Sequence, residues 1–156
     1  MYIYIVRHCQ ADEAFLDKEK HLSPQGIEEA ESIAAFLKPM KITVHYLFHS
    51  GKTRAQETAE ILSKAVKSSD GISRHSGINP DDPVEDVLVE FVSYNRDIML
   101  VSHLPFVENL AAFLLKGDNT KCGFNFSPGS VMCLKKDESE SWKLEWMISP
   151  SLLSKK

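Results

Sequence analysis

The feature that most constrains the fold is an alternation of short apolar runs with amphipathic helical segments, repeated three times along the chain. Buried strands are expected at Tyr2 to Val6, Val44 to His49 and Ile98 to Val101, because these runs are apolar and rich in β-branched or aromatic residues. Such alternation is typical of a parallel sheet with helices on both faces. We therefore expect an α/β three-layer sandwich with a mostly parallel central sheet.

Helices are expected after these strands, from their terminal signals and their apolar period. The first begins at Ser23-Pro24, an N-cap followed by a first-turn proline, and ends at Lys38-Pro39. A second begins near Lys52, which places Arg54 in its first turn. The residues expected on the buried faces of these two helices are Ile27, Ala30, Ala34 and Leu37, and Ala55, Ala59, Leu62 and Val66.

Two further helices are expected in the second half of the chain. One follows Asp82-Pro83, with Asp82 as the capping residue, and the other opens at Pro105. Between the second and third helices, residues 67–80 are rich in Ser, Gly and Asp and predict a loop with a short strand near Ile72. The residues expected on the buried face of the third helix are Val84, Val87, Leu88 and Phe91.

The end of the chain predicts a β-hairpin. Val131 to Leu134 and Trp142 to Met147 are apolar runs that flank a polar turn, and they would extend the sheet at one side. Trp142 and Trp146 stand at alternate strand positions, so we expect them on one face.

Length and composition favour a single globular domain over residues 1–156. Lys and Arg number 18 and Asp and Glu 22, a net charge of −4 without long blocks of one sign, which argues against a nucleic-acid partner.

Cys9, Cys122 and Cys133 form no C-x-x-C pair, so neither a zinc site nor a disulfide framework is indicated. Apolar runs fall short of the roughly 18 residues that a membrane span needs. We expect a cytoplasmic protein that does not bind membranes.

Unusual polar residues follow the three predicted strands. They are Arg7-His8, Ser50 to Arg54, and Ser102-His103. In open α/β sheets ligands bind beyond the carboxyl ends of the strands, so these residues are expected to meet. Two arginines and two histidines would form a cationic pocket, and guanidinium groups suit a tetrahedral phosphoryl group. We expect no metal or other cofactor, because the arginines supply the positive charge.

His8 is the candidate nucleophile. Two neighbouring arginines disfavour its protonated form, so that it would stay neutral near pH 7. It could attack phosphorus in line while Arg7, Arg54 and His103 stabilise the charge on the equatorial oxygens. Water would then complete the cycle and release inorganic phosphate.

The segments that carry these residues resemble those of the histidine phosphatase superfamily, whose fold is phosphoglycerate mutase-like. Arg7-His8 matches two of the three positions of the R-H-G signature, and Leu22 to Gly26 resembles the L-T/S-x-x-G segment. Ser50 to Thr58 resembles S-x-x-x-R-A-x-x-T, and Val101 to Pro105 resembles the second-histidine segment. The short chain and its ending, Trp146 to Pro150, are most similar to the SixA-type phosphohistidine phosphatases.

This resemblance implies a phosphohistidine intermediate on His8 and phosphate contacts from Arg7, Arg54 and His103. It also implies a substrate, a phosphorylated histidine on a protein such as a histidine phosphotransfer domain. Lys20 stands where the SixA-type subgroup often has a further arginine, and is a candidate for one more phosphate contact.

Cys9 departs from the family pattern, because it stands where the signature has glycine. A Cβ there is expected to shift the backbone of His8 or to crowd the pocket. A thiol beside a cationic pocket is also expected to have a lowered pKa and to be sensitive to oxidation. One alternative is therefore a non-catalytic phosphate- or protein-binding module that keeps the pocket.

A second alternative is a phosphatase of small phosphate monoesters. That reaction needs an acidic proton donor, because an alkoxide leaves poorly, whereas the imidazole of phosphohistidine needs less help. The sequence does not choose among the candidate donors, which are Asp12, Glu13, Asp17, Asp81, Asp82 and Glu85.

Overall fold

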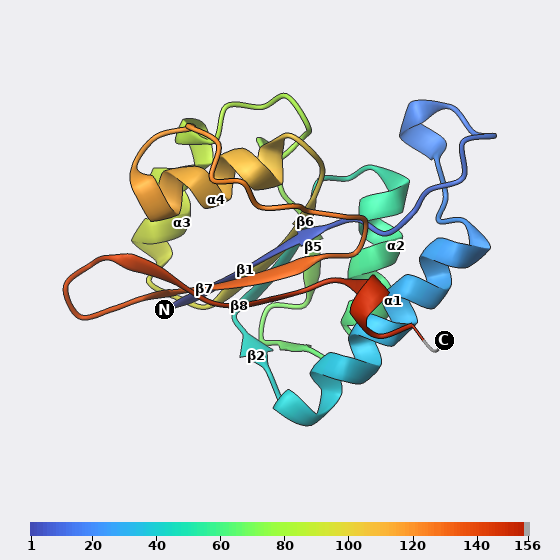
Figure 1. Cartoon of the computed structure of the whole chain (residues 1–156), viewed down its shortest axis with the longest axis horizontal. Helices are drawn as coiled ribbons and strands as arrows, with labels where there is room; N and C mark the ends of the chain where they lie inside the picture. Colours follow the sequence, from blue (N-terminus) through green and yellow to red (C-terminus); the bar gives the residue numbers. More distant parts are fainter. Residues whose placement is uncertain (155–156) are drawn as a thin grey trace.

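The computed structural model describes residues 1–154, with the backbone alone for Lys18, and has a six-stranded sheet between two layers of helices (Figure 1). The order of the strands is β5-β3-β6-β1-β7-β8. The first four are mutually parallel, while β7 runs antiparallel to β1 and β8. The predicted mostly parallel sheet and the hairpin at its side are confirmed. The strands are β1 (Tyr2–Arg7), β3 (Tyr46–His49), β5 (Ile72–Arg74), β6 (Ile98–Ser102), β7 (Val131–Lys136) and β8 (Trp142–Ile148).

Four α-helices cover this sheet, two on each face (Figure 1). The first two pack on one face and the last two on the other. Within residues 1–154 no helix is long and apolar enough to cross a membrane. The helices are α1 (Pro24–Leu37), α2 (Thr53–Leu62), α3 (Glu85–Tyr94) and α4 (Phe106–Lys116), with short 3-10 turns η1 (Asp17–Glu19), η2 (Lys38–Met40) and η3 (Pro150–Leu152).

The central strand β1 shows how the sequence builds these layers. Ile3 and Ile5 pack with α3 and α4, whereas Tyr4 and Val6 pack with α1 and α2, because side chains alternate along a strand. All four are buried. Full burial of an aliphatic side chain contributes about 1.5–3 kcal/mol, so a run that is apolar at every position favours a strand covered on both faces.

The predicted strand from Val44 to His49 is divided between two sheets. Val44 belongs to β2 (Thr43–Val44), which pairs with β4 (Lys67–Ser68) in a separate two-stranded sheet, and the main-sheet strand starts only at Tyr46. The backbone N–H of His45 donates to the carbonyl of Asp97 (2.8 Å) at this crossing point.

Helix α1 starts as predicted but buries a different stripe. The Ser23 hydroxyl accepts the backbone N–H of Gly26 at 3.0 Å, which confirms the N-cap. Ile27 is 41% exposed, so its predicted place in the core is wrong. The buried stripe begins at Gly26, because a Cβ there would lie 2.0 Å from the carbonyl oxygen of Gln10. That close backbone approach turns Ile27 outward.

Helix α3 has its predicted apolar face but not its predicted cap. Val84 is the N-cap residue, and the carboxylate of Asp82 instead accepts the backbone N–H of Asn79 at 2.8 Å. Asp82 therefore closes the preceding turn, and its predicted capping role is wrong.

The two tryptophans of β8 lie on opposite faces, contrary to the prediction. Trp146 packs with the α1 and α2 layer and Trp142 with the α3 and α4 layer. The cause is a bulge: Cys133 pairs with Trp146 but Leu134 with Leu144, so β8 has one extra residue, which reverses the faces beyond it.

Candidate active site

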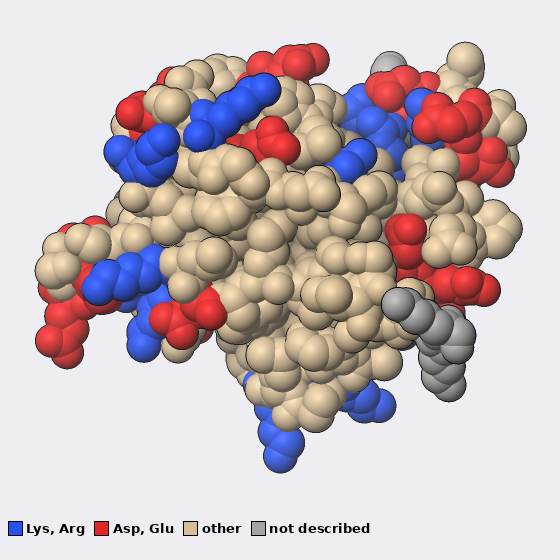
Figure 2. All heavy atoms as spheres, viewed as in Figure 1, with Lys and Arg blue, Asp and Glu red and all other residues tan. Residues whose placement is uncertain are grey.

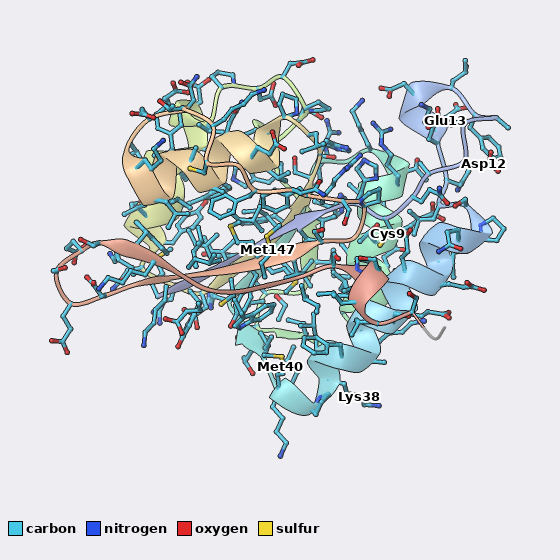
Figure 3. All side chains as sticks on the ribbon, in the orientation of Figure 1. Cys9, Asp12, Glu13, Lys38, Met40 and Met147 are labelled. Carbon is cyan, nitrogen blue, oxygen red and sulfur yellow. The ribbon has the colours of Figure 1, made fainter. Side chains whose placement is uncertain are left out.

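The three predicted polar segments meet at one edge of the sheet, because β3, β6 and β1 are neighbouring parallel strands. Arg7 pairs with Ser102 at the ends of β1 and β6, and His49 pairs with Val101 at the end of β3. Figure 3 shows Cys9 at this edge, below the projecting loop that carries Asp12 and Glu13. The sequence therefore predicted correctly which strand ends come together.

His8 lies at the centre of the polar group. Arg54 Nε donates to His8 Nε2 (3.4 Å), and the ring centroids of His8 and His103 are 4.9 Å apart. His8 Nδ1 is 2.7 Å from the carbonyl oxygen of Cys9, which can only accept a hydrogen bond. Nδ1 therefore carries the ring proton, and Nε2 presents its lone pair toward Arg54.

The electrostatics keep this imidazole neutral. Burial, together with the smaller effects of the charges of Arg54, Arg7 and Lys20, lowers the pKa of His8 to about 4 against the opposing hydrogen bond to Cys9. At pH 7 the ring is therefore neutral, and Nε2 keeps a lone pair, which here accepts from Arg54 Nε.

Arg7 is held at the end of β1 by main-chain atoms. Its Nη1 donates to the carbonyl of Phe126 at 2.7 Å, while its buried Nε has no hydrogen-bond partner among the described residues. Burial lowers the pKa of this guanidinium, and Glu108 and Glu29 oppose that effect. A buried, unpaired N–H on a cation is suited to an anionic ligand.

Arg54, in the first turn of α2 as predicted, joins this centre to the loop above it. Its Nη1 and Nη2 donate to the backbone carbonyl (2.7 Å) and the carboxylate (3.2 Å) of Asp17. Lys52 also binds this carboxylate, with Nζ 2.5 Å from Oδ2. The hydrogen bond from Lys52, followed by the charges of Arg54 and Lys52, lowers the pKa of Asp17. The carboxylate of Asp17 thus pairs with two cations of the site, Arg54 and Lys52.

His103 follows β6 and is buried. Its Nε2 lies 2.6 Å from the hydroxyl of Ser50, and its Nδ1 is buried without a partner among the described residues. Burial, with smaller contributions from His8, Arg54 and Lys52, lowers the pKa of His103 to about 2. The Ser50 contact was not anticipated, because it depends on the β3–β6 pairing rather than on any local pattern.

Lys20 lies at the edge of this group rather than inside it. Its Nζ pairs with Glu13 at 2.7 Å, and its charge still contributes to the lowered pKa of His8. Basic and acidic side chains meet where the loop joins the body, at the upper right of Figure 2. Lys52, which sequence reasoning missed, lies here too.

The expectation that the Cys9 thiol crowds the pocket with a lowered pKa is wrong. Its thiol is fully buried against Leu22 and Ala30 and does not enter the pocket. Gly129 makes room for it, since a Cβ on that glycine would lie 3.1 Å from the sulfur. Burial, with a smaller contribution from Glu29, raises the pKa of Cys9 to about 12, opposite to the expected direction. The backbone N–H of Cys9 is also anchored, by the hydroxyl of Thr58 at 3.1 Å.

The candidate proton donors make no direct contact with the two histidines. Among the described residues, no carboxylate hydrogen-bonds or ion-pairs with His8 or His103. Asp17 alone acts on His103 through its charge, and Lys52 and Arg54 already hold its carboxylate. No cluster of three or more His, Cys, Asp or Glu side chains in the described part of the chain is arranged to hold a metal ion.

Fold and site together point to one class of protein. The profile of the histidine phosphatase superfamily (branch 1) matches residues 3–75, the part of the chain that carries Arg7, His8 and Arg54, and the chain is similar to this superfamily.

Two kinds of phosphatase are among the proteins similar to this chain. Phosphohistidine phosphatase SixA of Escherichia coli (strain K12) is 24% identical over 155 residues, which cover 96% of this chain and 94% of SixA. A solved structure of the protein histidine phosphatase SixA complexed with tungstate matches with a TM-score of 0.86 at 25% identity, over 99% of this chain and all of that one. Serine/threonine-protein phosphatase PGAM5, mitochondrial, of Rattus norvegicus is 32% identical over 102 residues. That match covers 62% of this chain, which spans only 35% of the length of PGAM5.

Proposed function

We propose that the protein is a phosphatase that hydrolyses phosphohistidine on another protein through a phosphohistidine intermediate on His8. The observation that carries the proposal is the neutral His8 imidazole, whose Nε2 lone pair faces Arg54 and whose ring lies beside His103. Similarity to SixA over nearly the whole chain supports the same reaction.

In the proposed first step, His8 Nε2 attacks phosphorus and the P–N bond to the substrate imidazole breaks. Arg7, Arg54 and His103 donate to the phosphoryl oxygens, and Lys20 is a candidate for an additional contact at the edge. Water then attacks the phosphorus of the phosphorylated His8, which releases inorganic phosphate and restores the neutral ring. The two guanidinium groups offset the charge of the phosphoryl group, so the proposed reaction needs no metal ion.

The surroundings of the two histidines favour a phosphoramidate substrate. An alkoxide leaving group requires a well-placed acid, and no described carboxylate contacts either ring. The imidazole of phosphohistidine is a better leaving group and takes up a proton more readily. A protein substrate, such as a histidine phosphotransfer domain, and a cytoplasmic location are parts of this proposal.

The test is phosphate release from a phosphohistidine-bearing phosphotransfer domain in the presence of EDTA. We expect release by the natural protein and none by His8→Ala. A phosphoserine peptide and p-nitrophenyl phosphate are assayed in parallel as alternative substrates. Preferential turnover of those monoesters would replace the proposal by the monoester alternative. Tungstate binding without turnover of any of the three would replace it by a binding module. Activity lost in EDTA and restored by a divalent metal would overturn metal independence.

A further inference from the structure

Ser50 stands out among the buried polar groups for which the proposed reaction assigns no role. Its hydroxyl is 2.6 Å from His103 Nε2, and the residue is buried. Its position is set by the turn from β3 into α2, where Gly51 has φ 93° and a Cβ would lie 2.6 Å from Arg74 Nε. The main-chain path of this turn thus brings the Ser50 side chain to His103.

The direction of this hydrogen bond decides which nitrogen of His103 carries the proton. A neutral imidazole has one N–H and one lone pair. If Nε2 carried the proton, the buried and unpartnered Nδ1 would present a lone pair to its surroundings. If Nδ1 carries it, the same atom becomes a neutral hydrogen-bond donor.

A second contact of Ser50 settles the direction. The backbone N–H of Lys52 donates to Ser50 Oγ at 3.3 Å, so this oxygen already acts as an acceptor. His103 Nε2 is the remaining partner of the hydroxyl among the described residues. If Oγ accepted from both groups, its own proton would be buried without an acceptor, which costs about 1–3 kcal/mol. The hydroxyl therefore donates to Nε2.

We propose that Ser50 is a positioning residue that holds His103 in the Nδ1–H tautomer, so that Nδ1 donates to an oxygen of the bound phosphoryl group. With Nε2 engaged by Ser50, Nδ1 is the ring nitrogen that remains for a ligand. A neutral donor of this kind stabilises developing negative charge without any need to protonate a buried ring. This role deepens the proposed function and rests on it for the identity of the ligand.

The first test is the tautomer itself, which long-range ¹H–¹⁵N correlation spectra report without any turnover. In the natural protein at pH 7.5 we expect a protonated Nδ1 and an unprotonated Nε2 on His103. Ser50→Ala should shift the ring toward the other tautomer, whereas Ser50→Thr, which keeps the hydroxyl, should retain the natural spectrum. An Nε2–H tautomer in the natural protein would overturn the proposal, whatever the enzyme hydrolyses.

Ser102→Ala is the matched control. Ser102 is also buried and precedes His103, but its hydroxyl donates to the carbonyl of Ile78 at 2.6 Å and not to the imidazole. We expect its His103 spectrum to stay natural, and an equal tautomer shift in both alanine variants would overturn the proposal.

Ligand binding supplies the second test. Tungstate should perturb the Nδ1 signal of His103 more than the Nε2 signal, and Ser50→Ala should bind tungstate about tenfold more weakly, with recovery in Ser50→Thr. This loss is smaller than the roughly 10²–10³-fold effect of deleting an oxyanion donor, because the ring stays in place. Unchanged tungstate affinity in Ser50→Ala would overturn the role, while failure of the proposed function would leave the tautomer spectra as predicted.

Discussion

The candidate site has two regions that are built in different ways. Its floor, made of Arg7, His8, Ser50 and His103, is mostly buried and lies at the ends of paired strands, where Arg7 pairs with Ser102 and His49 with Val101. Its rim, made of Asp17, Lys20 and Lys52, depends on ion pairs whose acidic partners are largely exposed: Asp17 is 62% and Glu13 82% accessible.

Because of this difference, the rim can change its conformation more easily than the floor. Exposed ion pairs contribute typically 0.2–1 kcal/mol and are screened by salt, so the rim can rearrange at small cost. The floor cannot move without disturbing the central strands. Arg54 belongs to both regions, because its Nε contacts His8 while its two terminal nitrogens bind Asp17. Substitutions in the floor should therefore have large effects, and those in the rim small ones.

The largest effect is expected for Arg7→Lys. A lysine keeps the charge, but its donors all sit on one nitrogen, whereas the guanidinium donates to the Phe126 carbonyl from Nη1 and presents a separate N–H from another nitrogen to a phosphoryl oxygen. We expect kcat/KM to fall about 10²- to 10³-fold, as when an oxyanion donor is removed. The exposed Arg96→Lys is the control, and both variants should be compared by circular dichroism. A loss below tenfold in a folded Arg7→Lys would show that charge alone suffices there.

A smaller effect is expected from pH, acting on the buried histidines of the floor. The folded pKa of His8 is about 4 and the unfolded value is about 6.5, so between these values only the unfolded chain takes up this proton. Stability must then fall as pH decreases through this window, by roughly 2 kcal/mol at pH 5 for His8 alone. Urea unfolding at pH 7, 6 and 5 measures this, and His8→Asn should weaken the dependence. If the unfolding free energies of the natural protein and of His8→Asn depended equally on pH, His8 would not be a buried, neutral ring.

The floor could be predicted from the sequence because its position follows from strand order. Apolar runs end in Arg7-His8 and Ser102-His103, and parallel neighbouring strands bring such ends to one edge. The contact between Ser50 and His103 could not be predicted in the same way. It requires the turn at Gly51 and the pairing of β3 with β6, which no local pattern encodes.

Side-chain direction was the main source of error elsewhere. Whether Cys9 points into the pocket or into the core depends on space beside Gly129, which comes from residues far along the chain. Ile27 was misplaced because the backbone of Gln10 approaches α1 at Gly26, and Trp142 because a bulge in β8 reverses its face. The periodicities of 3.6 and 2 hold within regular elements and fail where backbones touch or bulge.

The smallest effect, and the sharpest test of the rim, is expected for Asp17→Asn. Its carboxylate occupies donors of Arg54 and Lys52 that a phosphoryl group could use, so it competes with an anionic ligand. We expect tungstate to bind about two- to fivefold more tightly, which corresponds to about 0.4–1 kcal/mol and matches the strength of an exposed pair. Calorimetric titration at low and high salt measures this, since the gain should shrink as salt screens the charges. Glu19→Gln, an equal charge change on the same 3-10 turn, is the control. Weaker binding by Asp17→Asn would mean that Asp17 aligns Arg54 for the ligand instead of competing with it, and the rim would then be as preorganised as the floor.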